Sequence, residues 1–111
     1  MPAKVLIVIS SSDREVVWTA LLYARAAIAS DWMGAAKVIL WGPSSRVVAD
    51  DAELRGNVRE VIALGERVYV CKACSDRYGA TEALAELGCT VEYVGPVSSG
   101  FIEQGYAVFN W

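Results

Sequence analysis

The sequence RVYVCKACSDRYGATEALAEL (residues 67–87) changes from strand character to helix character within a few positions. Its first part, Arg67 to Cys71, is rich in β-branched and aromatic residues without polar alternation, which is typical of a strand buried on both faces. The part from Lys72 to Leu87 has helical character and is divided by Gly79, with Thr81 as a candidate N-cap for its second half. A buried strand that leads directly into a helix is the basic unit of an α/β fold.

Four further apolar runs are expected to be strands of the same sheet. Two of them also lack alternation and should have helices on both faces, whereas the last two contain the polar residues Glu92 and Asn110 and are candidates for the edges. Alternating strands and helices predict a parallel sheet with right-handed crossovers, in a three-layer α/β/α sandwich. The expected strands are Lys4 to Ile9, Lys37 to Trp41, Arg67 to Cys71, Thr90 to Val94 and Tyr106 to Asn110.

The segments between these strands show the signals of helices. Ser12 and Glu15 form a Ser-x-x-Glu capping box, which predicts the start of the first helix. Gly34 is expected to provide the left-handed residue that ends this helical region. Apolar residues at helical spacing predict a second helix over about residues 51–64, and a short helix over residues 99–104 is expected to lead into the last strand.

Composition supports one well-buried domain that spans residues 1–111. Hydrophobic residues make up 55% of the chain and charged residues 21%, so a core can form without a metal or a disulfide. Histidine is absent, which excludes Ser-His-Asp and Cys-His catalysis and metals held by imidazole. The net charge is −3, and the basic residues are scattered, so binding to nucleic acid or to an anionic membrane is not expected.

The cysteines are expected to be thiols in a cytoplasmic protein. The longest apolar run near the start, Val5 to Ile9, is too short for a signal-peptide core or a membrane span. Cys71, Cys74 and Cys89 cannot all pair within the chain, and a reducing compartment favours free thiols. Three cysteines without histidine do not complete a structural zinc site, so we expect neither a metal nor another cofactor.

The carboxyl ends of parallel strands meet at one edge of a sheet, where ligands of α/β proteins usually bind. Cys71 is expected there, between a strand and the start of a helix, with Lys72 adjacent and Arg77 nearby. Positive charge and a helix N-terminus favour thiolate over thiol, and thiolate is the nucleophilic form. Cys74 lies one helical turn further on. A small residue that completes a buried strand would fit the position of Cys71 equally well, because free cysteine is often buried.

The segment VYVCKACSDRYG (residues 68–79) resembles the DsrE/DsrF-like (YchN-like) family of small sulfur-relay proteins. The resemblance extends to WGP (residues 41–43), VEYVG (residues 91–95) and FIEQGY (residues 101–106), and covers nearly the whole chain. It implies a five-stranded parallel sheet in the order 4-3-2-1-5. It also implies a homo- or hetero-oligomer, typically a trimer or hexamer, that exchanges sulfur with donor and acceptor proteins.

The resemblance further implies that Cys71 carries sulfur as a persulfide, because it matches the family's cysteine at the end of the third strand. Cys74 matches a second cysteine that only part of the family contains. The function that we expect is therefore a sulfur carrier, or sulfurtransferase-like protein, with Cys71 and Cys74 as catalytic residues and Lys72 and Arg77 as binding residues.

Two other functions fit parts of the sequence. A dithiol redox protein would use Cys71 to attack and Cys74 to resolve, as the Cys-x-x-Cys spacing permits. A non-catalytic module would hold an anion or a nucleotide phosphate at the serine-rich turn formed by Ser10, Ser11 and Ser12. This turn lacks the glycines of a pyrophosphate-binding loop, and a capped helix start explains it as well.

Overall fold

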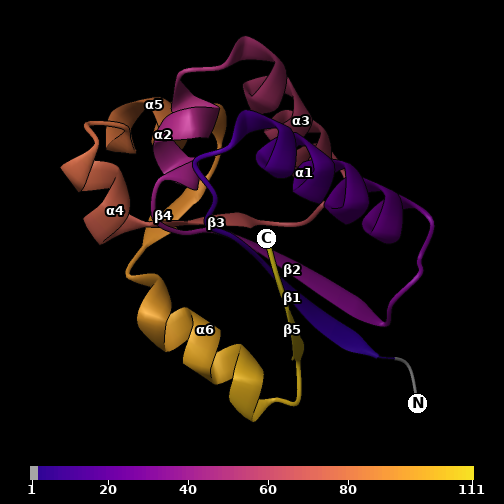
Figure 1. The fold of residues 1–111 in the computed structure, drawn as a ribbon. Helices are drawn as coiled ribbons and strands as arrows, with labels where there is room; N and C mark the ends of the chain where they lie inside the picture. The colour runs from indigo at the N-terminus through magenta and orange to yellow at the C-terminus, as the bar shows by residue number, and fades with distance from the viewer. Residues whose placement is uncertain (1–2) are drawn as a thin grey trace.

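The computed structural model describes residues 3–111 and contains one parallel sheet in the order β4-β3-β2-β1-β5 (Figure 1). Both the parallel sense and the strand order confirm the expected fold, with β4 and β5 at the edges. The strands are β1 Lys4–Ile9, β2 Ala35–Leu40, β3 Val68–Cys71, β4 Thr90–Glu92 and β5 Ala107–Asn110. The helices are α1 Arg14–Ala29, α2 Ser44–Ala49, α3 Ala52–Ala63, α4 Lys72–Arg77, α5 Thr81–Leu87 and α6 Val94–Glu103.

The two faces of the sheet are covered unequally (Figure 1). On one face, which we call the α1 face, α1, α2, α3 and α5 pack side chains such as Leu21, Leu54 and Leu84 into the larger apolar cluster. On the other, the α6 face, only α6 crosses the sheet, and the apolar cluster is smaller. The buried residues of this second cluster are Leu6, Val8, Ile39, Cys71 and Val94.

Strand β5 is exposed along its whole length although it pairs with β1. It lies at an edge, and its apolar residues Val108 and Phe109 are 44% and 39% exposed. An apolar edge strand of this kind is a common place for contact with another chain.

Helix α1 begins and ends differently from the prediction. Asp13, with an extended backbone, is the N-cap, and its carboxylate accepts hydrogen bonds from the N–H groups of Glu15 and Val16. The prediction of Ser12 as the cap is therefore wrong, because the residue directly before the helix is the one whose side chain reaches these groups. Gly34 is not the left-handed residue after α1, since Asp31 has that conformation, with φ 57°.

Helix α6 is longer than predicted, because it begins at Val94 instead of residue 99. Consequently β4 ends at Glu92, and the predicted strand to Val94 was too long. Pro96 lies in the first turn of α6, where its missing N–H removes no hydrogen bond within the helix. In the neighbouring α5, the N-cap is Ala80, so Thr81 is the first helical residue and not the cap.

Candidate functional site

Cys71 lies where β3 ends and α4 begins, as the sequence predicted. Cys71 is the last residue of the strand and the N-cap of the helix, and it is 5% exposed. Cys74, in the first turn of the six-residue helix α4, is half-buried and close enough to Cys71 for its own pKa to be affected. Both cysteines pack with the smaller apolar cluster, so the pair belongs to the α6 face.

The loop after β2 completes the surroundings of the two thiols. Trp41 follows β2 and packs in the same cluster as Cys71 and Cys74. Gly42 has a left-handed backbone, with φ 65°, and its N–H acts to lower the pKa of the Cys74 thiol. Most residues avoid this backbone conformation, which glycine adopts without strain. The turn at Gly42 thus brings a backbone N–H near the cysteine pair.

The surroundings of Cys74 favour its protonated form. Burial, and then the proximity of the Cys71 sulfur, raise the pKa of the Cys74 thiol above its ordinary value, while the Gly42 N–H and the charge of Arg77 act in the opposite direction. Cys74 therefore keeps its proton more readily than an ordinary thiol.

The two basic residues near the cysteines point to different partners. Lys72 Nζ lies 2.7 Å from the Asp76 carboxylate, and this pairing raises the pKa of Lys72 and lowers that of Asp76. The charge of Lys72 is thus shared with a carboxylate. The guanidinium of Arg77 lies over the ring of Tyr78, 6.0 Å from its centre, and exerts its electrostatic effect on Cys74.

The serine-rich turn is largely occupied by bonds within the protein. The Ser10 hydroxyl donates to the carbonyl of Trp111 at 3.2 Å, and the Ser11 hydroxyl accepts from the Asp13 N–H at 2.9 Å. Ser12 is exposed. The carboxylate of Asp13 already takes the free N–H groups at the start of α1, and its negative charge disfavours an anion there. Of the three serines, Ser10 alone lines a pocket on the α6 face.

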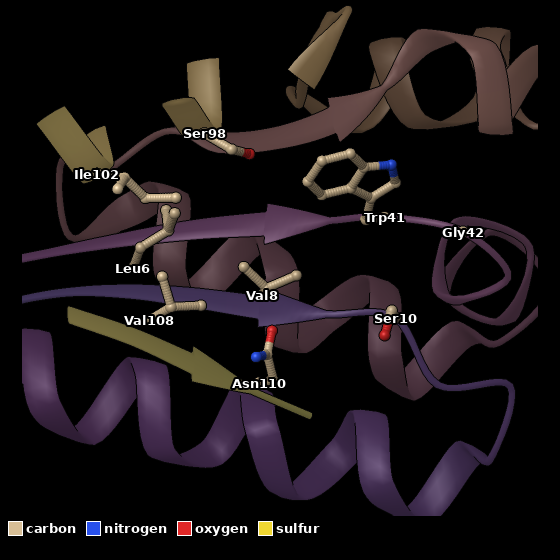
Figure 2. A pocket seen from close by; sticks show the side chains of 9 residues that line it. All are labelled: Leu6, Val8, Ser10, Trp41, Gly42, Ser98, Ile102, Val108 and Asn110. Atoms are coloured by element: carbon tan, nitrogen blue, oxygen red, sulfur yellow. The ribbon is translucent and has the colours of Figure 1, made fainter. Parts of the chain in front are cut away.

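This pocket, which we call the α6-face pocket, has a volume of about 370 Å³ and lies between α6 and strands β1, β2 and β5 (Figure 2). It reaches the cysteine site through Trp41 and Gly42, which border both. Its lining residues are Leu6, Val8, Ser10, Trp41, Gly42, Ser98, Ile102, Val108 and Asn110.

Sequence analysis did not identify this pocket. The register of the strands brings Trp41 and Asn110 to the same side of the sheet as Val8. Val8 pairs with Ile39 on one side and with Asn110 on the other. Trp41 follows Ile39 by two residues and therefore lies on the same face. Ser98 gave no signal, since the predicted helix began only after it.

The third cysteine is remote from this site. Cys89 belongs to the larger cluster on the α1 face, and burial raises its pKa to about 12. Within residues 3–111, no group of three or more Cys, Asp and Glu side chains is arranged to hold a metal ion. Over the same residues, no helix combines the length and the apolar character needed to cross a membrane.

Comparison with known proteins places the chain in a family. Its fold is similar to a conserved protein of unknown function from Bacteroides thetaiotaomicron, with a TM-score of 0.86 and 23% identity over 96% of this chain and 93% of the other. It is also similar to a protein of unknown function from Methanobacterium thermoautotrophicum, with a TM-score of 0.75 and 22% identity over 98% and 99% of the two chains. A search of curated proteins found no match. The model of the DsrE/DsrF-like family matches residues 3–111, and the chain therefore belongs to that family.

Proposed function

We propose that this protein is a sulfur carrier that holds sulfur as a persulfide on Cys71 and passes it to an acceptor thiol. The observation that carries the proposal is the placement of Cys71 at the end of β3 and the start of α4, with Cys74 packed in the same apolar cluster. Membership of the DsrE/DsrF-like family supports the same chemistry. Cys89 takes no part, because it is buried on the other face of the sheet.

The transfer is a thiol exchange without net oxidation. The Cys71 thiolate attacks the outer sulfur of a donor persulfide, R–S–SH, and a new S–S bond forms as the donor S–S bond breaks. The donor leaves as a thiolate, and the transferred sulfur keeps its proton as Cys71–S–SH. An acceptor thiolate then attacks this outer sulfur, and the Cys71 thiolate leaves.

Intact mass spectrometry after treatment with inorganic polysulfide tests this proposal. Polysulfide transfers one sulfur to a thiolate and leaves as a shorter polysulfide anion. We expect the wild-type protein to gain one sulfur, mapped to Cys71 by peptide analysis. Cys71→Ser should gain none at this position, while Cys89→Ser serves as the matched control and should load like the wild type. A Cys71→Ser protein that is folded and loads normally contradicts the proposal.

A dithiol redox function is the second candidate, because Cys71 and Cys74 are three residues apart and pack in the same apolar cluster. In that case two-electron oxidants would join the two sulfurs, with loss of two hydrogen atoms from the mass. Cys74→Ser separates the candidates. It should abolish a disulfide cycle, whereas persulfide loading on Cys71 should persist, because the second thiol is not part of the bond that forms.

We also propose that the protein is a cytoplasmic homo-oligomer, a trimer or hexamer, that exchanges sulfur with donor and acceptor proteins. Support comes from the exposed edge strand β5. The ring centres of Phe109 and Tyr23 are 5.1 Å apart, and Trp32 is 59% exposed. Sedimentation over a range of concentrations tests the assembly. Phe109→Lys should dissociate it, and a monomeric wild type at micromolar concentration would contradict this part of the proposal.

A further inference from the structure

The α6-face pocket is apolar and uncharged. Its floor is formed by alternate residues of two neighbouring strands, Leu6 and Val8 from β1 and Val108 from β5, and the indole of Trp41 borders one end (Figure 2). None of the nine lining residues is Asp, Glu, Lys or Arg. A volume of about 370 Å³ falls at the lower end of the range for small-molecule sites.

Ser98 gives this pocket a polar group with nothing to bind. Ser98 is 6% exposed, and its hydroxyl oxygen has no hydrogen-bond partner among the residues that the structure describes. Figure 2 shows this oxygen on the side of Ser98 that is nearer to Trp41. An unpaired buried hydroxyl is costly, so a ligand that pairs with it gains both contact and specificity.

The other buried serines show that this condition is unusual in the molecule. The hydroxyl of Ser44 donates to the carbonyls of Ile9 and Trp41, and that of Ser45 donates to the carbonyl of Gly42 at 2.8 Å. Ser75 pairs with Thr81 at 2.7 Å. Ser98 is therefore the buried serine whose partner is missing from residues 3–111, and the pocket is where that partner would lie.

We propose that the α6-face pocket binds an uncharged small molecule with a flat apolar body and one carbonyl oxygen, which accepts a hydrogen bond from Ser98. The flat body packs against Trp41 and the aliphatic floor. A charged ligand would lose its hydration without gaining an ionic partner, so the pocket selects against anions. This inference goes beyond sulfur transfer, since binding here does not require a sulfur on Cys71.

Benzamide and benzoate provide a matched pair of probes, because they share the ring and differ in charge. We expect benzamide to shift the backbone amide signals of Ser98 and Val108 and the indole N–H signal of Trp41 in a saturable way in NMR titrations. Trp41→Phe assigns the indole signal. Benzoate should bind at least about tenfold more weakly, since its charge would be buried without a partner.

Variants on α6 test the role of the hydroxyl. Ser98→Ala should weaken benzamide binding by about three- to tenfold, the effect of one hydrogen bond. Ser99→Ala is the matched control, because Ser99 is the exposed neighbour on the same helix, and it should bind like the wild type. Ile102→Trp should reduce binding further by filling the pocket.

Three results would overturn the inference. The first is equal binding of benzamide and benzoate, and the second is unchanged benzamide affinity in Ser98→Ala. The third is that the NMR signals around the pocket shift with protein concentration and not with benzamide. This face would then be a contact between copies of the chain. Loading of Cys71 with polysulfide is measured separately, so failure here leaves the sulfur-carrier proposal standing.

Discussion

The two faces of the sheet differ in how completely they are packed, and the candidate site lies on the less packed one. On the α1 face, Leu21 and Leu54 are 1% and 0% exposed beneath several helices. On the α6 face, one helix leaves Ile102 53% exposed and a pocket beside the cysteine pair. The α1 face thus provides most of the stability, and the α6 face leaves room for chemistry and for ligands.

The largest expected effect is a difference in stability between truncation of a buried side chain on the α1 face and truncation of a half-exposed one on the α6 face. Leu54→Ala should lower the free energy of unfolding by about 2–5 kcal/mol, because it removes a fully buried side chain and leaves a cavity. Ile102→Ala should cost about 0.5 kcal/mol or less, because much of its side chain is in water. Urea unfolding measures both. Similar losses in the two variants would show that α6 carries as much of the core as α3.

The second expected effect is a loss of stability in alkali caused by Cys89 on the α1 face. The unfolded chain releases the thiol proton from about pH 8.5, whereas the folded protein keeps it until about pH 12. The unfolded state is therefore favoured increasingly as the pH rises, by roughly 2 kcal/mol near pH 10.

Unfolding free energies of the wild type and Cys89→Ala between about pH 7 and about pH 10 test this. The variant should lose less stability over this range, whatever its stability at neutral pH. If the unfolding free energies of the two proteins changed equally with pH, Cys89 would ionise as readily in the folded protein as in the unfolded chain.

The third effect concerns the start of α1, the helix that defines the α1 face. Asp13→Ala should cost about 1 kcal/mol, because two N–H groups lose their acceptor. Ser12→Ala, one residue earlier, should change stability by less than about 0.5 kcal/mol. Thermal unfolding compares them directly, and a larger loss in Ser12→Ala would restore Ser12 as the cap.

The smallest expected effect compares two buried serines. Ser98→Ala on the α6 face should leave stability unchanged or raise it by up to about 1 kcal/mol, because the hydroxyl has no partner. Ser44→Ala should lower stability by about 1 kcal/mol, because its hydroxyl bonds two carbonyls. A marked loss in Ser98→Ala would mean that its hydroxyl is bonded in solution.

Sequence patterns predicted strand β1 better than helix α6, for physical reasons. The run Lys4 to Ile9 is apolar throughout, so its extent as β1 could be predicted at both ends. Helix α6 could not, because Gly95, Pro96 and Gly100 are turn residues by local preference. The helix forms because Val94 and Phe101 pack on the sheet, and tertiary contact of this kind overrides local propensity.

The candidate site shows the same division. Cys71 could be predicted at the strand end, because the change from strand to helix character is local. The contributions of Gly42 and Ser98 depend on how β2 and α6 are placed beside β3, which local patterns do not encode. Ser12 and Asp13 are neighbours, and both are good capping residues. Only the backbone geometry decides which of the two caps helix α1.

Chains that retain one of the two α6-face cysteines test the central claim most directly. Cys74→Ser/Cys89→Ser keeps Cys71 alone, and Cys71→Ser/Cys89→Ser keeps Cys74 alone. After treatment with inorganic polysulfide, intact mass spectrometry should show one added sulfur on the first chain and markedly less on the second, because Cys71 is the residue between β3 and α4 and because burial raises the pKa of the Cys74 thiol. Loading of the Cys74 chain with none on the folded Cys71 chain would contradict the account and assign the sulfur to the other cysteine.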